Sequence, residues 1–156
     1  MLNVEDYKRF LKDGTMVKEL NVGGVVYKVR LLNMQDVLVS DAVTDYLTGN
    51  ARSWTSPLNI SFETLARLVF IVEEIDGEVL KPEISEKAKE EFLEKMLDPE
   101  AAEDAKKDFV AKYVKPRLKK LLNLPPVVIE TLVEEYRKLR EELRNFVEGE
   151  GGLPNS

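Results

Sequence analysis

Acidic side chains are the groups in this sequence that could act as acid and base or hold a hard cation such as calcium. They occur as close neighbours, and the groups concerned are Glu73/Glu74/Asp76, Glu90/Glu91, Glu134/Glu135 and Glu141/Glu142. Adjacent residues on a helix point about 100° apart, so such neighbours do not converge on a single atom. Residues 76–78 are too short a stretch for a calcium-binding loop. We therefore interpret the acidic groups as solvated helix faces and expect no metal site.

The sequence contains no histidine and no cysteine. Histidine is the usual general base at neutral pH, and the cysteine thiolate is a common nucleophile and metal ligand. Zinc sites built from these two residue types are therefore excluded. Four serines have no histidine to activate them and lie outside any Gly-x-Ser-x-Gly elbow, namely Ser40, Ser53, Ser56 and Ser61. We expect a protein that is not an enzyme and that uses no cofactor.

Basic side chains are concentrated at residues 106–120, where Asp108 is the only acid among them. They are Lys106, Lys107, Lys112, Lys115, Arg117, Lys119 and Lys120. A basic helix face can bind phosphate groups or anionic lipid, or it can be a solvated face that pairs with the acids of residues 94–104. We favour the solvated face, because only Phe109 and Tyr113 interleave with the basic residues. The net charge of −6 also disfavours nonspecific binding of nucleic acid.

The composition is that of a soluble, folded protein. At 156 residues, with 44% apolar and 33% charged side chains, the chain can bury a core without disulfides. Its first residues lack the basic and apolar segments of a signal peptide. No apolar run approaches the ~20 residues that span a bilayer. These observations predict a cytoplasmic protein without a membrane partner.

The first 82 residues mix strand and helix patterns. Two β-branched stretches, residues 17–20 and 25–31, predict a hairpin closed by Gly23 and Gly24. Because this glycine pair stands between strands and does not lead into a helix, we interpret it as a turn and not as a phosphate cradle. An isolated hairpin is only marginally stable, so it must pack on helices or extend another sheet.

Helical patterns surround this hairpin. One helix should begin after Asn3 and a second after Asn33, since asparagine is a favourable N-cap. Residues 48–60 are expected to form a loop that contains the only tryptophan. A third, strongly apolar helix should begin at Ser61 and run to residue 75, where an Asp-Gly pair ends it. Residues 79–82 should be extended, because the residue before a proline avoids the helical region.

Residues 83–148 show helical patterns without strand signals, and residues 149–156 form a glycine-rich tail that we expect to be flexible. A helix should begin after Ser85, another at Asp98 with a kink near Pro116, and a last one after the paired prolines. The predicted fold is therefore α+β and mostly helical, with a small two-stranded hairpin packed on helices and a helical C-terminal part.

The last helical pattern carries apolar residues at alternating spacings of three and four, as in the seam of a coiled coil. They are Ile129, Leu132, Tyr136, Leu139 and Leu143. This seam could dock on a partner helix or on a second copy of the chain, or it could pack against the chain's own helices. Trp54 could likewise be an exposed anchor for a partner or a residue of the core. The seam and Trp54 are the predicted partner-binding residues.

Taken in order, these patterns resemble the cytosolic assembly chaperones of tailed bacteriophages, the group of tail assembly and baseplate-hub chaperones. The residues that carry the resemblance are the strand pair at 22–31 and the apolar helix at 65–77, which ends in Ile75-Asp76-Gly77. The stretch at 132–139 is similar in character, so the resemblance covers about half of the chain.

The resemblance implies a non-catalytic role in the cytoplasm of an infected host cell. It would consist in binding a long helical tape-measure or hub protein, keeping that protein soluble and recruiting tail-tube subunits. Amphipathic helices can shield an apolar stripe on such a partner, and a negative surface keeps the complex in solution. Two alternatives stay open: a structural virion subunit, such as a baseplate or head–tail connector component, and a nucleic-acid-binding regulator that uses residues 106–120.

Overall fold

The computed structural model describes residues 3–14, 16–48 and 61–151. Trp54, the rest of the predicted loop after residue 48 and residues 152–156 of the predicted tail lie outside these ranges. Within them, helices surround a four-stranded antiparallel sheet, which confirms the predicted α+β, mostly helical fold. Among the described residues, none of the helices combines the length and the apolar character needed to cross a membrane.

The sheet consists of two tight hairpins placed side by side. Its strands, in the order in which they lie, are β1 (Val17–Val22), β2 (Val25–Arg30), β3 (Val72–Ile75) and β4 (Glu78–Val79). The first hairpin turns at Gly23 and Gly24, with φ angles of 62° and 93°, and the second at Asp76 and Gly77, with 53° and 85°. Positive φ at both central residues is typical of a type I′ turn, whose twist suits two antiparallel strands.

The helix predicted up to residue 75 is wrong in its last part. Helix α3 (Phe62–Ile71) stops at Ile71, and the chain continues directly as strand β3. Val72 is β-branched and suits a strand, and β2 offers backbone groups that pair with β3, for example at Lys28 and Glu74. The predicted hairpin at residues 17–31 is confirmed, but it is one half of a larger sheet.

The helices other than α3 are, in chain order, α1 (Val4–Asp13), α2 (Met34–Thr48), α4 (Glu86–Met96), α5 (Ala102–Phe109), α6 (Lys115–Leu121) and α7 (Pro126–Phe146). The N-caps predicted at Asn3, Asn33 and Ser85 are confirmed, because each side chain accepts a backbone N–H three residues later. Ser61, the predicted start of the third helix, caps α3 in the same way. The helix start predicted at Asp98 is wrong. The carbonyl of Asp98 instead closes a turn by accepting the N–H of Ala102, where α5 begins.

A π-helical segment, Val110–Val114, joins α5 to α6, and a second one, Val147–Gly151, follows α7. In the first segment, the N–H of Lys115 donates to the carbonyl of Val110, which is one residue further back than in an α-helix. Pro116 gives the reason, because it has no N–H and its ring would clash with the carbonyl four residues earlier. The kink predicted near Pro116 takes the form of this wider turn.

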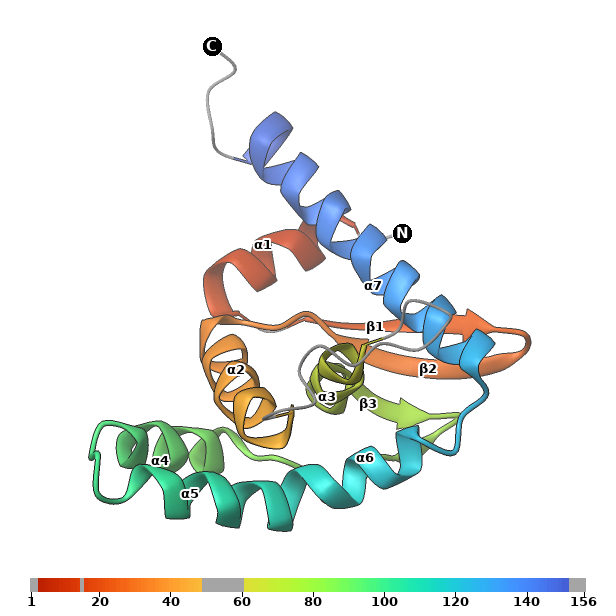
Figure 1. Cartoon of the computed structure of the whole chain (residues 1–156). Coiled ribbons are helices and arrows are strands. Elements are labelled where there is room, and N and C mark those ends of the chain that lie inside the picture. Colours follow the sequence, from red (N-terminus) through yellow and green to blue (C-terminus); the bar gives the residue numbers. More distant parts are fainter. Residues whose placement is uncertain (1–2, 15, 49–60, 152–156) are drawn as a thin grey trace.

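The helices pack around α3, which lies against the sheet (Figure 1). Helix α2 packs on α3 and also contacts α4 and α5, whereas α6 packs on α3 from below. Helix α7 crosses β1, and its C-terminal half rises past α1. One cluster of buried apolar side chains draws on both predicted segments, 1–82 and 83–148, and includes Val43, Leu68, Val72, Leu121 and Leu132.

Candidate functional site

Helix α2 carries apolar side chains on two sides. On the inner side, Val39 and Val43 are fully buried in the core. On the outer side, Met34, Leu38 and Tyr46 have exposed fractions of 68%, 47% and 39%. A surface helix normally presents polar residues to the solvent. The outer side of α2 is therefore a face on which exposed apolar side chains lie beside Asp41 and Asp45, and no described element covers it. Exposed apolar patches are typical of interaction surfaces.

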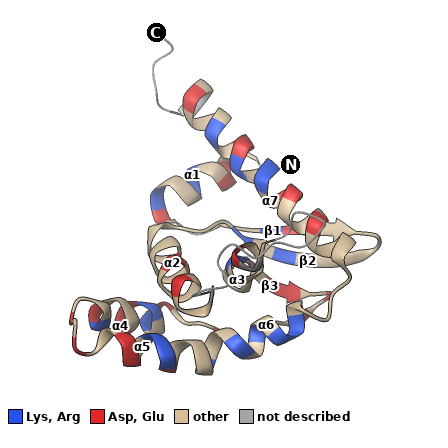
Figure 2. Ribbon diagram, in the orientation of Figure 1, with Lys and Arg blue, Asp and Glu red and all other residues tan. Residues whose placement is uncertain are grey.

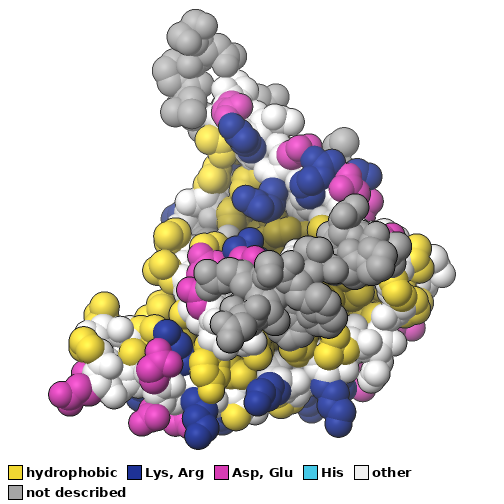
Figure 3. Space-filling model, viewed as in Figure 1, with side chains coloured by type: hydrophobic (Ala, Val, Ile, Leu, Met, Phe, Trp, Pro, Cys, Tyr) yellow, Lys and Arg dark blue, Asp and Glu magenta, His cyan; other side chains and the backbone are white. Residues whose placement is uncertain are grey.

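A groove of about 560 Å3 runs between α2 and α4 next to this face. Its apolar walls are Leu38 and Ala42 from α2 and Leu93, Met96 and Leu97 from the end of α4. Leu97 follows the last residue of α4 and is 85% exposed. In the space-filling view, hydrophobic side chains reach the surface on the left of the molecule, around α2 and α4 (Figure 3). The flexible thioether of Met96 can adapt its shape to a partner.

Acidic side chains border this groove. Glu90 and Glu94 lie one helical turn apart on α4 and are exposed, and within the described ranges neither forms an ion pair. Gln35 of α2 completes the polar part of the lining. Figure 2 shows acidic residues along α4 and α5, interspersed with basic ones. An apolar groove with free carboxylates at its rim is complementary to a partner that is apolar and basic.

A buried ion cluster joins α2, α4 and the sheet. The ammonium of Lys89 donates to Asp36 at 2.6 Å and to Glu86 at 2.9 Å, and Arg30 donates to Asp36 at 2.8 Å. Asp36 and Lys89 are each 1% exposed. Loss of one partner from a buried pair leaves an uncompensated charge, so α2 and α4 are held at a fixed separation. The groove is therefore formed before any partner binds.

Arg117 corrects the interpretation of residues 106–120 as a solvated face, because it is 2% exposed. Its guanidinium donates to four backbone carbonyls, those of Val69 at 3.0 Å, Val72 at 2.6 Å, Leu80 at 3.3 Å and Pro82 at 3.0 Å. Burial lowers the pKa of this guanidinium from its ordinary value. The first two carbonyls lie where α3 ends, at the negative end of its dipole. Arg117 therefore ties α6 to the end of α3, to the first residue of β3 and to the chain that follows β4.

Three residues of the predicted seam lie inside the molecule. Ile129, Leu132 and Leu139 are 4%, 1% and 5% exposed, and they belong to the hydrophobic core. In this structure they serve the chain's own packing, which is one of the two interpretations that the sequence leaves open. Trp54 lies outside the described residues, so its role stays a prediction.

The other two seam residues, Tyr136 and Leu143, line a second groove of about 300 Å3 between α1 and α7. The hydroxyl oxygen of Tyr136 accepts the N–H of Leu32 at 3.2 Å, and burial raises the pKa of its phenol. Arg140 and Arg144 border this groove. The structure thus leaves part of the predicted seam half-buried in a groove whose charged lining consists of Arg140, Arg144 and Glu148.

Several of the other acidic and basic side chains form ordinary helix-surface pairs. Arg137 pairs with Glu134 at 2.7 Å and with Glu141 at 2.5 Å, and Lys106 pairs with Glu103 at 3.2 Å. Among the described residues, no group of three or more acidic side chains is placed to hold a metal ion. These pairs lie on the outside of α5 and α7 and do not enclose a hollow.

The protein is thus an α+β body that carries a preformed apolar groove, and carboxylates without ion pairs among the described residues border this groove. Comparisons of the chain with protein-family models, with curated proteins and with solved structures found no match. The sequence patterns did not predict the groove between α2 and α4, which is formed by residues from positions 35–42 and 90–97. The signal that could have indicated it is the apolar character of α2 on both sides.

Proposed function

We propose that this protein is a non-catalytic binding protein that takes up a basic amphipathic helix of a partner in the groove between α2 and α4. The observation that carries the proposal is the exposure of Leu38 and Leu97 in that groove. Exposed apolar surface costs free energy in water, and a helix lying in the groove would bury it. Helices that bind in grooves use apolar anchors three, four and seven residues apart.

The charges of the groove select the kind of helix. Glu90 and Glu94 form no ion pair within the described ranges, so basic side chains flanking the apolar anchors of a partner would find free carboxylates. An acidic helix would bring like charges together and would be rejected. The ion cluster at Asp36 and Lys89 fixes the groove, so the protein does not have to order it on binding.

The resemblance to phage assembly chaperones supplies a class of partner, the helical tape-measure or hub protein of a tail. We propose that the protein holds an apolar stripe of such a partner during tail assembly in the host cytoplasm. An exposed apolar groove and a net charge of −6 support this role, because one covers the stripe and the other keeps the complex soluble. The assignment to phages is carried by the sequence resemblance.

A designed peptide tests the groove directly. The probe is a helix of about 18 residues, or five turns, with leucines at the a and d positions and lysines elsewhere. We expect it to shift the NMR signals of Leu38, Leu97 and Met96. The double substitution L38D/L97D should weaken binding by about tenfold or more, since it removes two apolar anchors and adds charge to the groove.

The controls separate the groove from the rest of the surface. L122D changes an exposed leucine at the end of α6, which is 55% exposed, and should leave binding unchanged. A peptide with glutamates in place of the lysines should bind far more weakly. Binding by L38D/L97D at wild-type strength would remove the basis of the proposal.

The phage assignment has its own test. The tagged protein is isolated from infected host cells, and mature particles are analysed for the same chain by mass spectrometry. Recovery with a long helical tail protein, together with absence from particles, is expected for an assembly chaperone. Presence in particles at a fixed copy number would make the protein a structural virion subunit instead.

A further inference from the structure

Two helices carry surface stripes of the same spacing and of opposite charge. On α4, Glu90 and Glu94 are followed by Leu97, at positions i, i+4 and i+7. At the end of α7, Arg140, Arg144 and Val147 have the same spacing. Residues four apart on a helix lie on the same side and rise ~6 Å, so two carboxylates on one stripe can face two guanidinium groups on the other simultaneously.

The charges of both stripes are available. Glu90, Glu94 and Arg140 are exposed, and within the described residues none of them forms an ion pair. Arg144 pairs with Glu148 at 3.1 Å, but this pair is exposed and belongs to neighbouring turns of one helix end. Such pairs are weak and exchange readily. Each stripe could therefore meet an outside partner without breaking a buried contact.

Each stripe also lies next to an apolar hollow. Leu97 protrudes at the end of the α4 stripe with 85% exposure, and the α7 stripe borders the groove that contains Tyr136 and Leu143. A leucine side chain entering that groove would be covered by apolar walls. Charge and shape thus match in the same register along the two helices.

We propose that the α4 edge of one copy docks on the end of α7 of a second copy. The occupant is a second copy, because this chain itself carries the complementary stripe with the matching spacing. In Figure 1 the two stripes lie at opposite ends of the molecule, α4 at the lower left and the end of α7 at the top, so one copy cannot satisfy both. The contact joins two different surfaces, so the copies at the two ends of a row each keep one surface free. Such a contact leads to chains or rings rather than to closed dimers.

This assembly competes with partner binding, because Glu90, Glu94 and Leu97 belong to the groove between α2 and α4 as well. That consequence rests on the proposed function, whereas the assembly itself does not. An assembled protein would keep the groove covered, and a basic helical partner would release single copies.

The first measurement is the molar mass by light scattering and sedimentation at rising protein concentration. At low ionic strength we expect the weight-average mass to rise above the 17.8 kDa of a single chain in a continuous way. Salt at ~0.5 M should lower it, because exposed charge pairs are screened. A mass that stays at 17.8 kDa up to ~1 mM at low salt, where screening is weakest, would overturn the proposal.

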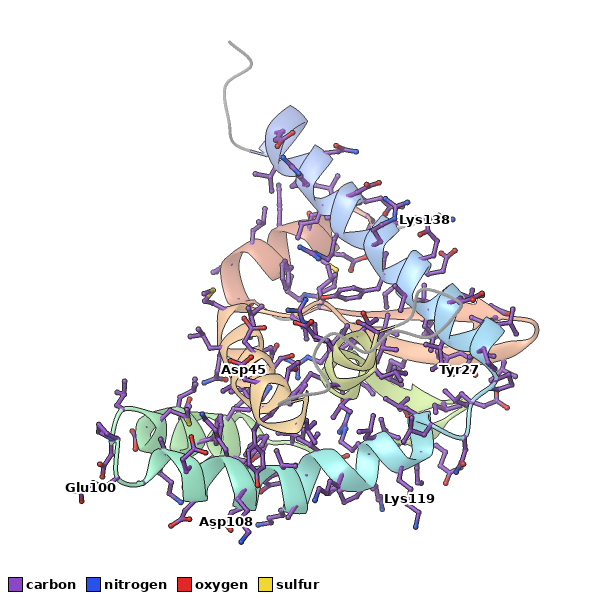
Figure 4. All side chains as sticks on the ribbon, viewed as in Figure 1. Tyr27, Asp45, Glu100, Asp108, Lys119 and Lys138 are labelled. Carbon is purple, nitrogen blue, oxygen red and sulfur yellow. The ribbon has the colours of Figure 1, made fainter. Side chains whose placement is uncertain are left out.

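A charge swap identifies the surfaces. E90K/E94K and R140E/R144E should each remain single chains, an equimolar mixture of the two should assemble, and the quadruple variant should assemble alone. The control K115E/K119E reverses two exposed lysines with the same spacing on α6, where Lys119 points away from the molecule (Figure 4), and should assemble like wild type. Circular dichroism checks that every variant is folded.

Assembly and peptide binding of R140E/R144E test the self-association and the proposed function separately. R140E/R144E leaves the groove between α2 and α4 intact and should bind the basic peptide while failing to assemble. Assembly of R140E/R144E at wild-type strength would overturn the inference, whatever the peptide does. If L38D/L97D no longer binds the peptide and the wild-type protein assembles, the results support both the proposed function and the assembly.

Discussion

At the scale of the residue, Arg117 stands out because it is a buried cation whose hydrogen-bond partners are all backbone carbonyls. Arginine suits this position, since its planar fork has donors pointing in several directions. A lysine would carry the same charge on a single atom. The side chain thus donates to carbonyls at the end of α3 that have no helical donor. It also donates to the carbonyls of Leu80 and Pro82, which follow β4.

Substitution of Arg117 should therefore be severe. We expect R117M to lower the free energy of unfolding by about 3 kcal/mol or more, because several buried carbonyls lose their donor. R117K should fall between R117M and wild type, since one ammonium cannot reach both α3 and Pro82. Urea denaturation measures these differences. The control K119M alters an exposed lysine of the same helix and should change stability by less than about 0.5 kcal/mol, and an equal loss in both variants would contradict the role of Arg117.

Tyr136 should make stability depend on alkaline pH. Its pKa is raised in the folded state by burial, so the folded form favours the neutral phenol. The contribution of the neutral phenol to the free energy of unfolding is fully present below the ordinary pKa of about 10. It is lost as the pH rises through the pKa of the folded state. At pH 7, Y136F should lose about 1 kcal/mol, because the N–H of Leu32 loses its acceptor. The gap between wild type and Y136F should then narrow above about pH 10.

Chemical denaturation at several pH values between 7 and 11 measures this gap. Lysines titrate in the same range, but they are common to both proteins and cancel in the difference. Y46F, at an exposed tyrosine, serves as the control. A gap between wild type and Y136F that does not vary with pH would show that ionisation of Tyr136 is not coupled to folding.

The buried residues show what sequence patterns can and cannot give. The seam spacing predicted which side of α7 is apolar, and Ile129, Leu132 and Leu139 do form its buried side. Lys89 and Arg117 gave no such signal, because a lysine or arginine within a charged stretch is usually solvated. Arg117 depends on acceptors 35 to 48 residues away in the chain, and Lys89 depends on Asp36, 53 residues away. No local pattern contains such partners.

At the scale of the element, the two hairpins differ in how well the sequence predicts them. The first has two β-branched stretches around Gly23-Gly24, and periodicity alone identifies it. The second has the equally informative pair Asp76-Gly77, but the apolar residues of α3 run into it without a break. An apolar run cannot distinguish a buried helix from a strand by periodicity. Pairing with β2 decides where α3 ends, and that contact is not local.

Gly77 provides a test of the second turn. Its φ is 85°, and a Cβ at this position would meet no atom within 4 Å, so the cost of G77A is a backbone cost. We expect G77A to lower the free energy of unfolding by about 1 kcal/mol and G77N to be better tolerated, because asparagine enters the left-handed region more readily. Gly149 has open space and no positive φ, so G149A should be neutral. Equal stability of G77A and wild type in urea denaturation would contradict the turn assignment.

At the scale of the whole molecule, the candidate site emerges only from packing. Leu38 and Leu97 are 59 residues apart in the sequence and become neighbours because α2 and α4 are clamped by the ion cluster of Asp36 and Lys89. The sequence predicted the class of fold and a role in protein binding, but it placed the contact on α7. The exposed apolar surface of the structure lies instead between α2 and α4.

The π-helical segment before Pro116 has a consequence for chain length. Each residue of an α-helix turns the following chain by about 100°, so one residue more or fewer between α5 and α6 would rotate all of α6. Arg117 would then face away from Val69 and Val72, and the apolar side of α6 would leave α3. The number of residues from Phe109 to Arg117 is therefore fixed by the fold. The exposed turn between α4 and α5 can change its length without this effect, and insertions belong there.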